Sequence, residues 1–372
     1  MIYKEITMKN LLIIGFIITF SITKAQDSIS VFSIPKALKS VTPYGTIENV
    51  LSVSKSGFYI SDFIPRVGLK GDWNISDNGK YKMFTKIEFG LNLVRRDDYI
   101  KFSADPGTGK VSQTVFIRLG LIGISTPFGN ISIGRQWGVN YTLAGNIDDM
   151  YMGGGYAIGV YNAGTDGGIS GTGRADQSVK YEFKNKHFYF GAQAQLRNIS
   201  DNNQFFADSY GFASYYKLGI IKLGASYNKV LDGVEHPTVS QAKINDELIT
   251  GLIDFKLNNF HLGIMPEYFV NHEKTDIDTF YTGYGLEYSV RFNFGKNKKW
   301  RFVNNSYFLL PTNKNSKYLL NAYTVNLAYR FSDNTAVIVG FTYDNSTNYD
   351  GAKPQNHIIG IGFYYNFNYP VP

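Results

Sequence analysis

Apolar and polar residues alternate with a period of two along much of the chain. Between residues 280 and 294, one parity carries Phe280, Thr282, Tyr284, Leu286, Tyr288, Val290, Phe292 and Phe294, and the other carries Tyr281, Gly283, Gly285, Glu287, Ser289, Arg291 and Asn293. Residues 359–368 repeat the pattern, with aliphatic and aromatic residues at odd positions and mostly glycine and asparagine at even positions. Successive strand residues point to opposite faces, so this pattern predicts strands with one apolar face and one face toward water.

The alternating runs are longer than the strands of most soluble proteins, which average about 5 to 6 residues. Short polar turns such as Ser76-Asp77-Asn78-Gly79 and Lys184-Asn185-Lys186 separate them. A soluble β-sandwich also alternates, but long strands with short turns on one side and longer loops on the other are typical of an outer-membrane barrel. We therefore predict an all-β fold, a transmembrane antiparallel β-barrel.

Counting the alternating runs gives about sixteen strands. They are expected near residues 43–53, 61–74, 80–95, 112–126, 130–138, 175–184, 187–198, 205–217, 220–231, 247–257, 259–270, 280–294, 298–310, 318–332, 334–345 and 355–369. A bacterial barrel of one chain has an even number of strands, and about 16 of them enclose an aqueous channel.

The first residues have the pattern of an export signal. Lys4 and Lys9 precede an apolar run from Leu11 to Ile22, and the small Ala25 follows. Such a run is too short to span a bilayer comfortably as a helix, and the flanking residues predict cleavage after Ala25 or the residue that follows it. We therefore expect residues 1–25 to be a signal peptide, with Met8 as an alternative initiator, and residues 26–372 to form one barrel domain.

Composition agrees with this assignment. Tyr and Phe each occur 28 times, and 38 Gly accompany only 11 Pro, which favours strands and tight turns. The sequence contains no Cys, which excludes disulfides, thiolate metal sites and cysteine nucleophiles. The formal charge of +7 is spread among acidic residues along the whole length, so we expect no nucleic-acid partner.

One connection is anomalously long. No sustained alternation is found between the strand ending near Gly138 and the strand beginning near Ala175, and glycine is abundant there, as in Gly153-Gly154-Gly155. Connections of this length are usually functional. A flexible external loop remains the alternative interpretation.

Three segments resemble the general bacterial porins: Phe63–Gly71 (FIPRVGLKG), Phe128–Gln136 (FGNISIGRQ) and Gly173–Tyr181 (GRADQSVKY). Members of that family are sixteen-stranded trimeric barrels of Gram-negative outer membranes, and their third external loop folds into the lumen. The resemblance therefore implies a homotrimer in outer-membrane lipid that lets ions and small hydrophilic solutes diffuse passively. It also implies that the long loop of this chain is the inward-folded third external loop.

The same resemblance implies a constriction in which basic wall side chains face acidic loop side chains. Arg66, Arg135 and Arg174 match the family's wall arginines, and Asp149 matches a loop acid. Opposed charges in a narrow passage focus the electric field and orient solutes. Arg118 is a further candidate, because its flanking apolar residues point it inward by alternation.

Departures from the family pattern leave some positions open. Asp148 and Asp166 are alternatives for a second loop acid, because the sequence YMGGG at 151–155 replaces the Pro-Glu-Phe-Gly-Gly of well-known members. Arg135 has the same parity as the lipid-facing Ile131 and Ile133. It must therefore lie beyond a bulge, at the strand end, or against a subunit interface.

Other chemistry finds little support in the sequence. The five histidines have no metal-ligand spacing, and no Gly-x-Ser-x-Gly motif is present, so we expect no catalytic, cofactor or metal site. A substrate-specific outer-membrane channel for phosphate, sugars or carboxylates is the main alternative function. A barrel enzyme and a soluble lectin-like β protein are the others.

Overall fold

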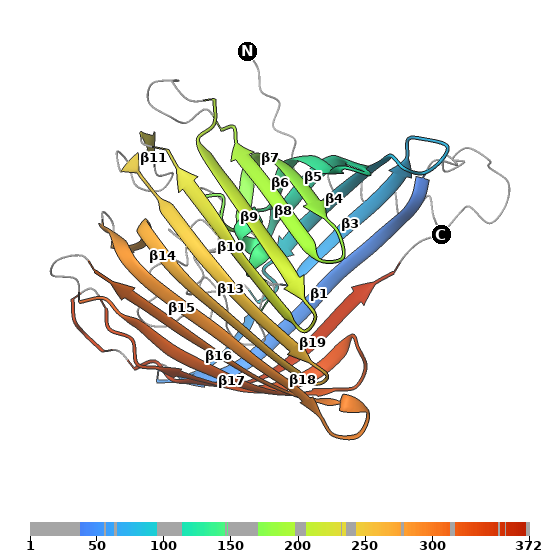
Figure 1. Cartoon of the computed structure of the whole chain (residues 1–372). Coiled ribbons are helices and arrows are strands. Elements are labelled where there is room, and N and C mark those ends of the chain that lie inside the picture. The colour runs from blue at the N-terminus through green and yellow to red at the C-terminus, as the bar shows by residue number, and fades with distance from the viewer. Residues whose placement is uncertain are drawn as a thin grey trace, which may run out of the picture.

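A computed structural model describes residues 38–55, 57–62, 65–94, 114–145, 147, 170–197, 206–231, 233–235, 243–276, 279–312, 317–348, 350–353 and 355–369. Nearly all of these residues belong to one antiparallel sheet that closes on itself (Figure 1). Closure is made by β1 (Leu38–Ser54) and β19 (Ile358–Asn368), which pair from Tyr44 and Asn368 to Ser54 and Ile358.

The wall contains sixteen strands in the closed sheet. The short β2 (Gly57–Asp62) pairs with one part of β1 and β3 (Arg66–Asn74) pairs with the rest, so together they occupy one strand position. The remaining strands are β4 (Lys82–Leu91), β5 (Val115–Thr126), β6 (Gly129–Trp137), β7 (Arg174–Lys184), β8 (Phe188–Gln195), β9 (Ser209–Leu218), β10 (Ile221–Val230), β13 (Glu247–Leu257), β14 (Phe260–Asp276), β15 (Thr279–Phe294), β16 (Trp300–Pro311), β17 (Leu320–Arg330) and β18 (Thr335–Asp344). The predicted barrel and its sixteen strands are confirmed.

The two ends of the barrel differ. At the turn end, connections are short, as between Leu257 and Phe260, where Asn258 takes a positive φ of 50° that asparagine tolerates well. At the loop end, connections include residues 92–114, 138–173 and 196–208, and a two-stranded ribbon of β11 (Val234–Glu235) and β12 (Lys243–Ile244). The turn after β15 holds a 3-10 helix, η2 (Lys296–Lys298).

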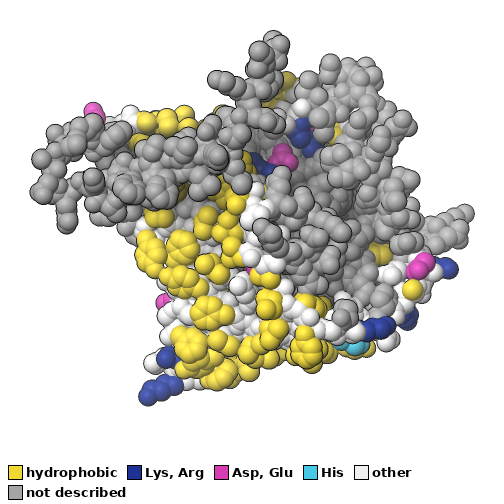
Figure 2. All heavy atoms as spheres, turned by 180° about the vertical axis from the view of Figure 1, so that it is seen from behind, with side chains coloured by type: hydrophobic (Ala, Val, Ile, Leu, Met, Phe, Trp, Pro, Cys, Tyr) yellow, Lys and Arg dark blue, Asp and Glu magenta, His cyan; other side chains and the backbone are white. Residues whose placement is uncertain are grey.

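The outer face carries an apolar belt. Exposed aliphatic residues recur at alternate positions, for example Ile249 and Ile253 on β13 and Ile359 and Ile361 on β19. Figure 2 shows hydrophobic side chains gathered over the outside of the barrel. Among the described residues, no helix is long and apolar enough to cross a membrane.

Aromatic side chains border this belt on both sides. At the turn end, the rings of Phe294 and Trp300 lie 6.4 Å apart and those of Trp300 and Tyr329 lie 4.9 Å apart. Nearer the loop end, Tyr268 and Tyr284 lie 5.3 Å apart. Two aromatic girdles flanking an apolar band are the pattern by which a barrel sits between two membrane interfaces.

The inner face is mostly polar. Inward side chains that the structure buries include Ser226, Thr250, Asp254, Glu287, Ser289, Asn305, Thr324, Asn326 and Thr342. Apolar inward positions are grouped rather than scattered, and the group on β8, β9, β13 and β14 is the one that receives the segment described next.

Candidate pore constriction

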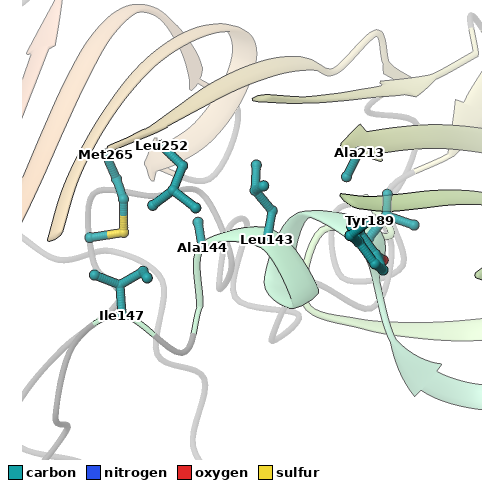
Figure 3. Close-up of a cluster of buried hydrophobic side chains, with 8 residues drawn as sticks. Leu143, Ala144, Ile147, Tyr189, Ala213, Leu252 and Met265 are labelled. Carbon is teal, nitrogen blue, oxygen red and sulfur yellow. The ribbon is translucent and has the colours of Figure 1, made fainter. Parts of the chain in front are cut away.

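The chain enters the barrel after β6. The short helix α2 (Val139–Leu143) and the residues after it pack against the inner wall, where Val139, Leu143, Ala144 and Ile147 are buried with Tyr189, Ala213, Leu252 and Met265 (Figure 3). Six of these eight apolar side chains are larger than alanine, so this contact buries apolar surface that would otherwise face water in the lumen.

Small inward residues of the wall make room for this segment. Val139 lies over Gly191 and Gly211, Leu143 lies over Gly224, and Ile147 lies over Gly263. A β-carbon at Gly224 would be 2.7 Å from Leu143, and one at Gly263 would overlap Ile147. Glycine is therefore required at both positions for the close approach.

The segment runs a long way around the inner wall. It leaves β6, and Ile147 contacts β14, although β7, β8, β9, β10 and β13 lie between those two strands in the sheet. A segment joining such distant strands inside a closed barrel narrows the passage. The described residues 139–145 and 147 thus lie inside the barrel. Residues 146 and 148–169 lie outside the described part of the chain, and the inward fold of the long loop stays a prediction.

The two ends of the long connection are tied together at its base. Gly138 N–H donates to Gly173 O at 2.7 Å, and Tyr141 N–H donates to Thr172 O at 3.2 Å. The buried side-chain amide of Gln193 on β8 bridges both sides: its Oε1 accepts from Val139 N–H at 2.7 Å and its Nε2 donates to Gly171 O at 2.6 Å. The wall therefore fixes where the loop begins and ends.

We predict that Gln193→Leu loosens this base without unfolding the barrel. It removes two buried hydrogen bonds and leaves backbone groups unpaired, which costs about 2 kcal/mol, or roughly a thirtyfold increase in local opening. Hydrogen exchange at Ala144 and Gly145, whose amides are bonded within α2, should accelerate accordingly. The Ile133 amide on β6 is the internal control, and equal acceleration there would instead indicate general destabilisation.

A basic ladder lines the wall of β3, β4 and β5. Arg118 Nε lies 2.8 Å from Glu88 Oε1, Tyr44 OH donates to Glu88 Oε2 at 3.0 Å, and Lys86 Nζ lies 3.8 Å from Glu88 Oε2. Arg66 interacts electrostatically with Glu88 from β3. One buried carboxylate thus holds several cations in place, and the wall keeps a positive excess.

Arg118 faces inward beside a bulge. The register of β4 and β5 shifts so that Glu88 lies opposite Leu119 and Phe89 lies opposite Ile117, which leaves Arg118 as the extra residue. A bulge re-aims the side chains of its strand. Arg118 alternates with the exposed Val115 and Ile117, as expected from the sequence, and the parity of β5 changes after it, so that the next residue, Leu119, is buried as well.

Arg174 joins the ladder through an aromatic stack. The rings of Trp137 and Tyr141 are stacked with centroids 3.6 Å apart. The guanidinium carbons of Arg174 and Arg118 lie 5.5 Å and 6.0 Å from the Trp137 ring centre. Cations at this distance are attracted by the ring quadrupole, so the base of the loop and the basic wall form one continuous surface.

Arg135 matched a wall arginine by motif, but its parity had left its direction open. It lies opposite Gly120 of β5, whose β-carbon position lies toward the exposed Ile117, and it has the same parity as the exposed Ile131 and Ile133. The structure therefore places Arg135 on the outer face, where its Nε lies 2.8 Å from Asp176 Oδ1. This removes it from the wall ladder. Asp148, Asp149 and Asp166 lie outside the described residues.

Several residues of this site were not singled out from the sequence. Lys70 and Lys86 extend the basic ladder, with their ammonium groups 5.9 Å and 5.1 Å from the Tyr44 ring centre. The sequence pattern that could have identified these two lysines is the alternation, which assigns Lys70 of β3 and Lys86 of β4 to the inner face. The role of Gln193 had no local signal, because its partners lie 22 and 54 residues away. In the described part of the chain, no group of His, Asp and Glu could hold a metal ion.

Comparisons with known proteins agree with this geometry. A family model described as Gram-negative porin matches residues 20–371. A search of curated proteins finds no significant match. Among solved structures, the chain is similar to OmpF of Salmonella typhi in complex with daunomycin, with a TM-score of 0.68, 16% identity, and coverage of 88% of this chain and 97% of that one.

Two further solved structures have the same fold. An anion-selective porin from Comamonas acidovorans has a TM-score of 0.66 and 16% identity, with 88% of this chain and 99% of that one covered. The trimer form of OmpT from Vibrio cholerae has a TM-score of 0.58 and 16% identity, again with 88% and 99% covered. At such identity the likeness concerns the fold alone.

Proposed function

The chain belongs to the family of Gram-negative porins, and from this membership we propose that it is a channel for passive diffusion of ions and small hydrophilic solutes. Its family and its closed barrel place it in the outer membrane as a channel. The finer proposal concerns what passes through it and how the passage is narrowed.

One observation carries this proposal: residues 139–145 and 147 lie along the inner wall from β6 to β14, and basic wall side chains lie beside the base of this segment. We propose that Arg66, Arg118 and Arg174 form the basic side of a constriction. Asp149, or Asp148 beside it, is proposed as the opposing acid. A barrel of about 16 strands leaves room for water beside such a segment.

The test is electrical. Purified protein added to a planar bilayer should produce discrete current steps that scale with KCl concentration. In liposome swelling, the rate should fall as the sugar becomes larger. A correctly folded barrel, shown by circular dichroism, that gives no current steps would contradict the proposal. We propose no enzymatic role, so the same preparation should hydrolyse neither lipid nor peptide.

We further propose that the chain is a homotrimer joined through the outer face of β3–β7. Exposed positions of this sector are aliphatic, including Ile122 and Ile133, and the Arg135–Asp176 ion pair lies beside them. Charged groups are costly in lipid, whereas a subunit interface can enclose a paired charge. The trimer form solved for OmpT of Vibrio cholerae is in line with this arrangement.

We predict that Ile122→Trp/Ile133→Trp converts trimers to monomers, because the larger rings prevent close approach of two subunits while lipid tolerates them. Unboiled samples in mild detergent should change from trimeric to monomeric migration. The matched control is Ile253→Trp/Ile361→Trp, which alters the lipid-facing side of β13 and β19. Trimer loss in the control alone would place the interface there instead.

A further inference from the structure

A cluster of charged side chains lies on the inner wall between the constriction and the turn end. Asp254 of β13 is central to it. Lys222 Nζ lies 3.0 Å and Lys256 Nζ 3.3 Å from Asp254 Oδ2, and His261 Nε2 lies 2.6 Å from Asp254 Oδ1. Arg291 Nη2 lies 2.8 Å from His261 Nδ1.

Strand pairing builds this cluster. Lys222 of β10 lies directly opposite Asp254, and His261 of β14 lies opposite both Lys256 and Arg291. All five side chains therefore occupy two adjacent rows of the inner wall on four neighbouring strands. Backbone hydrogen bonds between the strands hold these rows in place, so the arrangement of the five side chains does not depend on the loops.

The hydrogen bonds define the charge of the cluster. A guanidinium can only donate, so His261 Nδ1 accepts from Arg291, and its Nε2 carries the proton that it donates to Asp254. His261 is thus a neutral link between Arg291 and Asp254, and the Asp254 carboxylate is shared between Lys222 and Lys256. The cluster has a positive excess.

The acidic and basic side chains of the cluster differ in how much of each is exposed to the lumen. The Asp254 side chain is 3% exposed and that of His261 is 5% exposed, whereas the Lys256 side chain is 57% exposed. A solute in the lumen therefore meets the Lys256 side chain first and part of the Lys222 side chain, which is 19% exposed, while the acid that orients them is covered. Each ammonium has three donors, so the lysines keep donors for a second partner.

The position of the cluster relative to the constriction matters for transport. Lys222 Nζ lies 5.0 Å from the ring centre of Tyr215, which packs against the buried segment of α2. Asp254 lies opposite Gly263, the glycine that Ile147 covers. An anion that has passed the constriction meets this cluster next.

We infer that Lys222, Lys256 and Arg291 form an oxyanion-binding site on the turn side of the constriction, positioned by Asp254 and His261. Its ligands are small oxyanions with two negative charges, of which inorganic phosphate is the simplest. Two ammonium groups and a guanidinium suit such a ligand because charge-assisted hydrogen bonds to it are short and strong. This inference rests on the proposed function, since it gives the channel a preferred class of solute.

The experiment measures block of single-channel KCl current by inorganic phosphate added to each side in turn. We expect a saturable block with a lower half-blocking concentration from the turn side. Lys222→Gln/Lys256→Gln should raise that concentration at least about tenfold, the effect of losing one or more charge-assisted hydrogen bonds. The matched control Lys296→Gln/Lys298→Gln removes two charges from η2 at the same end and should leave the block unchanged.

A second variant guards against misfolding caused by an unpaired Asp254. Lys222→Gln/Asp254→Asn/Lys256→Gln removes the carboxylate together with its partners and should also lose the block. Open channels whose current phosphate leaves unchanged, or a block that both variants retain, would overturn the site while leaving the channel intact. A folded protein that forms no channel would overturn the proposed function, and this inference with it.

Discussion

Replacing Leu143 and Ile147 together by aspartate should release the lumen segment from the wall and raise single-channel conductance. Both side chains are buried against apolar residues and glycines of β10 and β14. An aspartate at either position would place a carboxylate among buried apolar side chains, and burying such a charge costs several kcal/mol. Release of the segment costs less free energy than burial of the two carboxylates, because the hydrogen bonds between the barrel strands do not depend on the segment.

The expected increase in conductance is on the order of twofold, since current through a water-filled pore follows its narrowest cross-section. Leu93→Asp/Phe206→Asp is the matched control, because it adds the same charges at exposed positions of the loop end. Trypsin sensitivity of the released segment should rise in parallel in detergent. Unchanged conductance in the folded double variant would mean that the segment does not limit the current.

Removing two arginines from the wall should change ion selectivity. Arg118→Gln/Arg174→Gln takes away both cations that lie over Trp137 and leaves Glu88 with fewer partners. Charges around a narrow passage create potentials of more than kT, so the permeability ratio of chloride to potassium should fall about threefold or more. The reversal potential in a tenfold KCl gradient measures this ratio.

The control for this prediction is Arg135→Gln, which removes the same charge from the outer face. It should leave the reversal potential unchanged, because it lies beyond the wall and is paired with Asp176. Asp149→Asn should shift selectivity in the opposite direction, toward anions, if Asp149 faces the wall ladder. An effect of Arg135→Gln equal to that of the double variant would refute the outward placement of Arg135.

The sequence was sufficient for the architecture of the wall. Each strand side chain has only two directions available, so period-two alternation states directly which positions face lipid and which face the lumen. Strand length and turn composition then gave the number of strands. For residues 280–294 the prediction and β15 agree within one residue.

Part of the candidate site could also be inferred from the sequence. Arg66 and Arg174 were identified by their motifs; the structure places Arg174 beside Trp137 at the base of the inward segment, and Arg66 interacts electrostatically with Glu88 of the basic wall. Arg118 was expected to point inward by alternation, and it does so, but the bulge beside it, which buries Leu119 as well, could not be inferred from alternation. Arg135 was matched by motif to the wall, although its parity already indicated the outer face.

Only the tertiary structure determined which side chains meet. Gln193 bridges Val139 and Gly171, and the cluster at the turn end joins Lys222, Asp254 and Arg291 from three strands. Strand register sets these contacts, and a shift of two residues keeps every side chain on its face while giving it new neighbours. The pattern of polar and apolar residues determines the face on which each side chain lies. Strand pairing, bulges and the position at which the loop packs on the wall determine which side chains it contacts.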